Sequence, residues 1–83
     1  MQYVRFNGST PHLGTNYEDY LVFEDDAPIE LIANSSINYA LENAKKFSHF
    51  RPAEMARADW TEACLSLATW CFVSKEEFDE AID

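Results

Sequence analysis

The fold of this chain is decided by the stretch LATWCFV at residues 67–73 and by the SKEE that follows it at residues 74–77. Tryptophan, phenylalanine, valine and threonine favour β-strands, because aromatic and branched side chains pack well on a pleated surface. Ser74 followed three residues later by Glu77 is a capping-box pattern, which marks the start of a helix. Residues 67–73 are therefore predicted to form a third strand, followed by a short C-terminal helix.

A continuous helix over residues 59–73 is the alternative. The spacing of Trp60, Cys64, Leu67 and Cys71 would place these four side chains on one helical face. Short apolar runs cannot be assigned to helix or strand from their period alone. Residue composition favours the strand, and the helix remains open at this point.

The N-terminal part of the chain is expected to hold two strands joined by a long loop. Residues 2–6 and residues 19–24 both mix β-forming apolar residues with polar neighbours at a period of two, as half-buried strands do. Between them, residues 7–17 contain both glycines and the first proline, which are typical of turns. The two strands are therefore predicted to flank an unusually long connection.

A long amphipathic helix is predicted to follow. Asp25 or Asp26 can accept hydrogen bonds from free backbone N–H groups, and Pro28 suits a first helical turn. Apolar residues then recur at steps of three and four over residues 29–47, which predicts a helix of about five turns.

A second helix is expected to open at Arg51 and Pro52, with a possible restart at Asp59. The predicted order is then β-β-α-α-β-α. This order indicates an α+β fold: a small three-stranded antiparallel sheet packed by two longer helices and a short C-terminal helix, with the helices on one sheet face. Residues 1–83 are predicted to be a single domain.

The composition is strongly acidic. The chain has 15 Asp and Glu against 6 Lys and Arg, a formal net charge of -9, and 47% hydrophobic residues. It is too apolar for a disordered acidic tail. Direct binding to nucleic acid is disfavoured, because that affinity comes mainly from cations that neutralise phosphates. Neither a signal-peptide pattern nor a membrane-length apolar run is present, so we expect a cytosolic protein with no membrane partner and two reduced cysteines.

Eleven of the fifteen acids fall into two blocks. The second block lies at residues 76–83 and contains Glu76, Glu77, Asp79, Glu80 and Asp83. The first block lies at residues 18–30 and contains Glu18, Asp19, Glu24, Asp25, Asp26 and Glu30. Such blocks are commonly solvated faces, yet they also attract basic surfaces.

The N-terminal region carries a recognisable pattern, Tyr-x-Arg-Phe-x-Gly-x-Thr-Pro-x-x-Gly-Thr-x-Tyr-Glu-x-Tyr. The matching residues are Tyr3, Arg5, Phe6, Gly8, Thr10, Pro11, Gly14, Thr15, Tyr17, Glu18 and Tyr20. In this pattern, and in the ending at residues 73–78, the chain resembles small acidic uncharacterised proteins of Gram-positive bacteria and their mobile elements. The resemblance implies a phage, plasmid or conjugative-element setting, in which small acidic proteins include anti-CRISPR inhibitors. It implies no catalytic residue.

No residue pattern indicates a cofactor or metal site. Glu24, Asp25 and Asp26 are adjacent, so their side chains do not converge on one ion. Cys64 and Cys71 lack the paired spacing of zinc ligands. We therefore predict no metal, no cofactor and no enzyme activity; a small enzyme or ligand binder that uses His12 and Cys64 is a minor alternative.

The predicted function is that of a protein-interaction module. Tyr17 and Tyr20 would anchor a partner while the first acidic block contacts its arginines. The expected partner is the basic groove of a nucleic-acid-handling protein, such as a host defence effector, which this nucleic-acid mimic would inhibit. The alternative is a homo-oligomerising or adaptor protein whose apolar interface contains Trp60, Trp70 and Phe72. The chain is then a monomer in the first case or a homodimer in the second.

Overall fold

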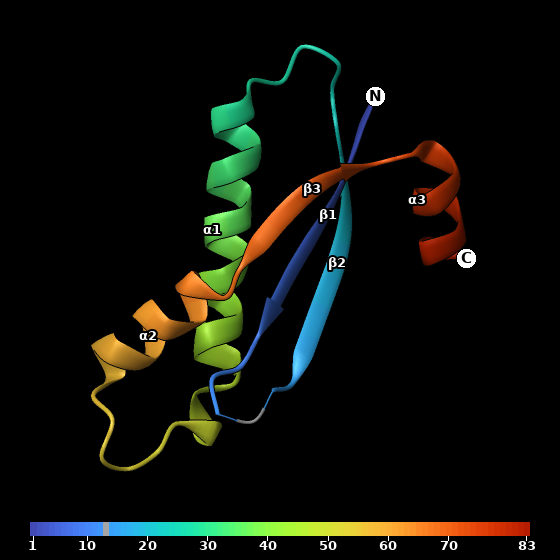
Figure 1. Cartoon of the computed structure of the whole chain (residues 1–83). Coiled ribbons are helices and arrows are strands. Elements are labelled where there is room, and N and C mark those ends of the chain that lie inside the picture. Colours follow the sequence, from blue (N-terminus) through green and yellow to red (C-terminus); the bar gives the residue numbers. More distant parts are fainter. Residues whose placement is uncertain (13) are drawn as a thin grey trace.

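The computed structural model describes residues 1–12 and 14–83, and it has the predicted α+β architecture with the order β-β-α-α-β-α (Figure 1). Leu13, in the predicted loop, lies outside the described residues. The strand predicted over residues 67–73 is confirmed over Thr69–Val73, in place of one continuous helix. The elements are β1 (Gln2–Ser9), β2 (Asn16–Phe23), α1 (Ile29–Lys46), a short 3-10 helix η1 (Ser48–Phe50), α2 (Arg57–Ser66), β3 (Thr69–Val73) and α3 (Lys75–Ile82).

The sheet is antiparallel with the strand order β2-β1-β3, so the N-terminal strand is central. Phe6 pairs with Asp19 on one side and with Trp70 on the other. Because side chains alternate along a strand, the sheet has two distinct faces. We call the face that carries Val4 and Phe6, against α1, the inner face, and the opposite one the outer face.

The two N-terminal strands are longer than predicted. β1 extends to Ser9 and β2 begins at Asn16, so the connection shrinks from residues 7–17 to residues 10–15. Thr10 closes this turn twice, because its backbone N–H donates to the Thr15 carbonyl at 2.9 Å and its hydroxyl accepts from the Thr15 N–H at 3.2 Å. Residues that were predicted to form the loop therefore extend the two strands instead, since strand pairing satisfies their backbone N–H and C=O groups.

The inner face of the sheet packs against α1. Val4, Phe6 and Ile32 of α1 are 0% exposed. The aromatic rings of Phe23 and Tyr39 lie 6.5 and 5.8 Å from that of Phe6. This cluster is the main hydrophobic core.

A second apolar cluster joins α1 to α2. Trp60 and Cys64 of α2 are buried against Ala44 of α1. The indole Nε1 of Trp60 donates to the backbone carbonyl of Ala44 at 2.9 Å, which satisfies its one polar atom. α2 is thereby fixed to the C-terminal half of α1.

The cap of α1 and the start of α2 differ from the prediction. α1 starts at Ile29 as expected, but its N-cap is Pro28, which makes no side-chain cap hydrogen bond; the carboxylate of Asp25 contacts the Met1 ammonium group instead. α2 starts at Arg57, neither at Arg51 nor at Asp59. The chain before α2 forms a turn closed by the Met55 N–H and the Pro52 carbonyl at 3.0 Å.

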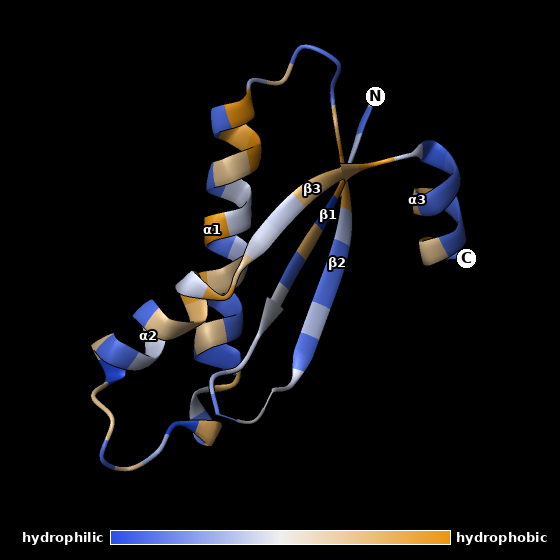
Figure 2. Ribbon diagram, in the orientation of Figure 1, coloured by the Kyte–Doolittle hydropathy of each residue, from blue (hydrophilic) through white to orange (hydrophobic). Residues whose placement is uncertain are grey.

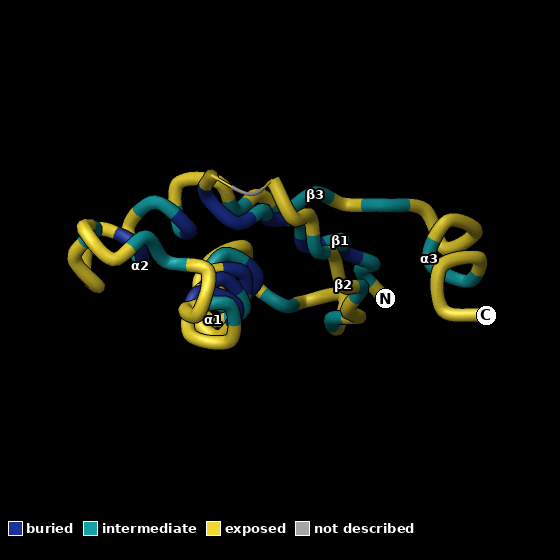
Figure 3. The backbone as a smooth tube through the Cα atoms, turned by 90° about the horizontal axis from the view of Figure 1, so that it is seen from below, coloured by how far each residue is buried: buried dark blue, intermediate teal, exposed yellow. Residues whose placement is uncertain are grey.

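The C-terminal helix lies on the outer face, which corrects the prediction that all helices share one side. Ser74 is its N-cap, as the capping box predicted, and its hydroxyl accepts from the Glu77 N–H at 3.1 Å. The ring of Phe78 lies 5.0 Å from that of Tyr3 and 6.4 Å from that of Tyr20, which are both outer-face residues. In Figure 3 the strands run through the middle, with α1 and α2 on one side and α3 on the other.

The molecule is flat and elongated, at 44 × 26 × 15 Å. Its radius of gyration is 14.0 Å, against about 12 Å for a compact domain of this length. Figure 2 shows hydrophilic residues along most of α3 and along the half of β2 that follows the turn. The small core and long outline leave much of the surface available for contacts.

Candidate protein-interaction surface

The first acidic block is spread over three elements. Glu18 lies on the outer face of β2, where its carboxylate accepts a hydrogen bond from the Asn7 side chain at 3.4 Å. Asp19 belongs to the inner face, and its side chain accepts from the neighbouring Tyr20 N–H at 2.9 Å. Glu30 lies in the first turn of α1. The remaining three, Glu24, Asp25 and Asp26, follow directly after β2.

The turn after β2 is held in place by the start of the chain. The side-chain amide of Gln2 donates to the carbonyls of Glu24 at 2.8 Å and Ala27 at 3.2 Å. The Met1 ammonium contacts Asp25. These bonds fix the backbone of the turn while all three of its carboxylates stay exposed.

The second acidic block is carried by α3. Glu77 pairs with Arg5 at 3.2 Å, and Asp79 pairs with Lys75 one helical turn away at 2.8 Å. Of the eleven acids in the two blocks, only Asp25, Glu77 and Asp79 form an ion pair with any residue that the structure describes. The other eight carry uncompensated charge at the surface.

Packing of α3 brings the second block to the outer face of the sheet. Phe78 contacts Tyr20, and Arg5 joins Glu77 to the centre of the sheet. α3 therefore lies next to β2, as both Figure 1 and Figure 3 show. Glu18 shares the outer face with α3, whereas Asp19 and Glu30 lie on the side of α1. The first block is thus divided between the two sides of the sheet, and Glu18 lies on the face to which α3 docks. We call the outer side of β2 together with α3 the acidic surface.

The two predicted anchor tyrosines lie on opposite faces. Tyr17 points inward, with its ring 5.7 Å from that of Tyr39 and 5.8 Å from that of Phe47. Its hydroxyl is buried and has no hydrogen-bond partner among the described residues. Burial, with smaller contributions from Cys64 and Tyr39, raises the pKa of Tyr17. Tyr17 is therefore a packing residue in this fold, while Tyr20 is half-buried under α3.

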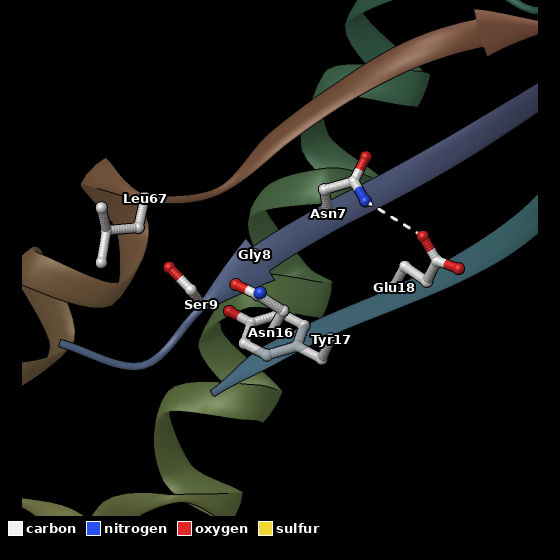
Figure 4. Close-up of a pocket in the computed structure, with 7 residues that line it drawn as sticks. All are labelled: Asn7, Gly8, Ser9, Asn16, Tyr17, Glu18 and Leu67. Carbon is white, nitrogen blue, oxygen red and sulfur yellow. Dashed lines mark hydrogen bonds between the residues drawn. The ribbon is translucent and has the colours of Figure 1, made fainter. Parts of the chain in front are cut away.

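A cavity that no sequence pattern indicated lies at the end of the sheet nearest the turn between β1 and β2. It has a volume of about 460 Å³, and its lining residues come from β1, β2 and the residue that follows α2 (Figure 4). Its polar groups are the amides of Asn7 and Asn16, the hydroxyl of Ser9 and the carboxylate of Glu18. Strand pairing places these residues together, so only the extended register of β1 and β2 could have revealed the cavity.

The structure also shows the positions of the residues proposed for the two alternative functions, an apolar interface and a small enzyme or ligand binder. Trp60, one of the aromatics proposed for an apolar interface, is 2% exposed and lies in the core, which removes it from that role. Phe72 is 52% exposed on β3. Cys64 is buried, and burial raises the pKa of its thiol, the opposite of what an activated nucleophile requires. His12 is exposed in the turn between β1 and β2 with a φ of 72°.

Within residues 1–12 and 14–83, no three His, Cys, Asp or Glu side chains lie close enough to hold a metal ion together. Over the same residues, none of the helices has the length and apolar content to span a bilayer. Comparison with family models, with curated proteins and with solved structures returned no match to this chain.

Proposed function

We propose that this protein is an acidic interaction module that binds the basic, nucleic-acid-binding groove of another protein and competes with nucleic acid there. The observation that supports the proposal best is the docking of α3 on the outer face of the sheet. That docking places the second acidic block on the same sheet face as Glu18.

The energetics of the acidic surface favour a binding role. Like charges brought together on a small fold repel one another and reduce its stability. A fold that gathers uncompensated carboxylates around a docked helix therefore gives up stability locally, which is typical of functional sites. Opposite charge on a partner would relieve this repulsion and would steer the encounter.

The chemistry of the surface matches arginine and lysine. Carboxylates accept paired hydrogen bonds from a guanidinium group. The cavity next to Glu18 adds side-chain amide oxygens that can accept further bonds from a long cationic side chain. Together with the resemblance to proteins of mobile elements, these features favour a host defence effector, such as a CRISPR surveillance complex, as the target.

The test measures competition with a defined target, a Cas9-type effector from a Gram-positive host, loaded with guide RNA. The protein should slow target-DNA binding, and its association rate should fall by about ten-fold or more between 50 and 500 mM NaCl, because exposed charges are screened. Glu76→Lys combined with Glu80→Lys should lower the rate similarly. The matched control is Glu54→Lys combined with Glu62→Lys, which changes the same charge on and before α2 and should have a smaller effect.

A rate that is independent of salt, or that falls equally in both double variants, would argue against a specific acidic surface. A series of effectors with different grooves extends the test if the first does not bind. If the protein inhibits none of these effectors, the acidic surface does not compete with nucleic acid.

A second candidate is self-association through apolar surface. The exposed side chains of Phe72, Ile37 and Leu67 favour it. Light scattering over a hundred-fold range of concentration, on the protein and on Phe72→Asp, decides this point. A mass that stays monomeric throughout would eliminate the homodimer.

A further inference from the structure

The unpaired cations of the chain gather at the end of the molecule opposite to α3. Arg5 and Lys75 form ion pairs with acids of α3. The other four, Lys45, Lys46, Arg51 and Arg57, form no ion pair with any described residue. They lie at the C-terminal end of α1, after η1 and at the start of α2, which Figures 1 and 3 both place far from α3.

Three of these cations line one cavity. The cavity has a volume of about 270 Å³ and lies between α1 and α2. Its lining includes Lys45, Arg51 and Arg57, the hydroxyl residues Ser48 and Thr61, and the indole of Trp60. Although the chain has 15 acids, no carboxylate residue is among the described residues that line it. The local charge is therefore the reverse of the net charge.

The framework that holds these cations is rigid. Trp60 is buried, and its indole nitrogen bonds to the Ala44 carbonyl, so α1 and α2 keep a fixed separation at the cavity. The guanidinium group of Arg51 is held by the Met55 carbonyl, just before α2. Arg51 is thereby pre-positioned, which lowers the entropic cost of binding an anion, whereas Lys45 and Arg57 are exposed.

The start of α2 adds backbone donors to the same place. Its N-cap is Ala56, which has no side chain that can accept from the first turn of N–H groups. Arg57, the first residue of the helix, lines the cavity. Free N–H groups at a helix start favour negative charge, and Asp59 in the same first turn offsets part of this effect.

We propose that this cavity is a binding site for the phosphate group of a small phosphate-bearing molecule. Three cations line this one cavity, which suits an anion with two charges and several acceptor oxygens better than a single carboxylate. The volume lies just below the usual range for ligand sites, which limits the ligand to about the size of a mononucleotide. The acids of α3 oppose binding little, because α3 lies at the opposite end of the molecule (Figures 1 and 3) and salt screens charges beyond about 8 Å.

The test is a titration of the ¹⁵N-labelled protein in 150 mM NaCl with pyrophosphate, with AMP and with adenosine, followed by amide and indole shifts. Saturable shifts at the Trp60 indole and at the amides of Arg57 and Thr61 are expected with pyrophosphate and AMP. Adenosine should cause none. Tighter binding of AMP than of pyrophosphate would identify a nucleotide site, and the reverse would identify a site for inorganic phosphate groups.

The adjacent lysines of α1 provide a matched pair of variants. Lys45→Gln should weaken binding about ten-fold, the value of one charge-assisted hydrogen bond. Lys46→Gln removes the same charge one residue away, where the ammonium lies over the Phe47 ring at 5.4 Å, and should change affinity less than about two-fold. Arg57→Gln should also weaken binding, and Arg57→Lys should retain most of it. Equal losses in the two lysine variants, linear shifts without saturation, or shifts with adenosine alone would overturn the proposal.

Discussion

The ring of Tyr17 packs so closely on Gly8 that it leaves no room for a side chain at position 8. The two residues pair across β1 and β2, and the Tyr17 ring covers the backbone of Gly8. A Cβ at position 8 would lie well inside van der Waals contact with the ring carbons and hydroxyl of Tyr17. Gly8→Ala is expected to cost about 1–3 kcal/mol, as overpacking does.

Urea unfolding of four proteins measures this effect: the unmodified protein, Gly8→Ala, Tyr17→Ala and the double variant. In the Tyr17→Ala background the added methyl group should cost much less, because the ring is gone. An unchanged cost in that background would show that glycine is required at position 8 for its backbone conformation and not for contact with the Tyr17 ring.

The buried hydroxyl of Tyr17 should also make stability depend on alkaline pH. Because burial raises its pKa, the unfolded chain loses this proton first as the pH rises. The stability is then complete below the ordinary tyrosine pKa of 10.0 and is lost as the pH rises through the higher folded value. Tyr17→Phe should reduce that loss and, by removing an unpaired polar group, raise stability at pH 7 by about 1 kcal/mol.

Urea midpoints at pH 7 and pH 10.5 check both effects, with Tyr20→Phe on the outer face as the control. The same gain at pH 7 in Tyr20→Phe would contradict the assignment to the unpaired hydroxyl.

At this scale the sequence could only partly predict the site. Tyr17 and Tyr20 look equivalent in the sequence, since both stand beside acids. Their difference follows from register: an interval of three residues places two side chains on opposite faces of a strand. That register depends on β2 beginning at Asn16, which the turn-like residues before it concealed.

α3 depends on its cap more than the other helices do. It has 8 residues and no buried residue, whereas α1 has 18 residues and contributes to both core clusters. Ser74→Ala removes the acceptor for the Glu77 N–H and should cost about 1 kcal/mol. Hydrogen exchange should show α3 opening more often, and binding of a basic partner should weaken although no acid has been removed.

Ser35→Ala is the matched control, because its hydroxyl bonds within α1 to the Leu31 carbonyl at 2.8 Å and caps nothing. Faster exchange of α3 in that variant, or unchanged exchange in Ser74→Ala, would contradict the role given to the cap.

The types of the elements were predictable, and most of their limits were not. The capping box at Ser74 and the apolar period of α1 depend on local chemistry, so both predictions are confirmed. The predicted start of α2 was wrong, because Pro52 begins a separate turn and the helix begins only at Arg57. The predicted cap of α1 was also wrong, since the Asp25 carboxylate contacts the Met1 ammonium group instead. Both errors concern a choice between competing partners that only the folded chain decides.

The whole molecule should become more stable when salt is added. Its net charge of -9 and its closely placed acids repel one another, and salt screens this repulsion. Raising NaCl from 20 to 500 mM should stabilise the fold by about 1 kcal/mol, which corresponds to about 4–8 °C in the melting temperature.

A variant with Glu76→Gln and Glu80→Gln should respond less to the same change, because α3 then carries fewer charges. Calorimetry measures both melting temperatures. An identical response in the two proteins would mean that the stabilising effect does not come from the acidic surface.

The arrangement of charge over the molecule lay beyond prediction from the sequence. The two acidic blocks are evident in the sequence, but the position of the second one depends on α3 crossing to the outer face, where it contacts Tyr3 and Tyr20. The basic cavity depends likewise on how α2 packs on α1. Such contacts join residues far apart in the chain, and no local pattern encodes them.

The central position of β1 has a consequence for how the protein is made. β1 is synthesised before its neighbour β3, which follows in the chain only after α1 and α2. Until β3 is made, the sheet consists of a two-stranded hairpin, with one edge of β1 unpaired and open to other chains. A fragment that stops before Thr69 should therefore be aggregation-prone, and slow decoding between β2 and β3 would prolong the same exposure.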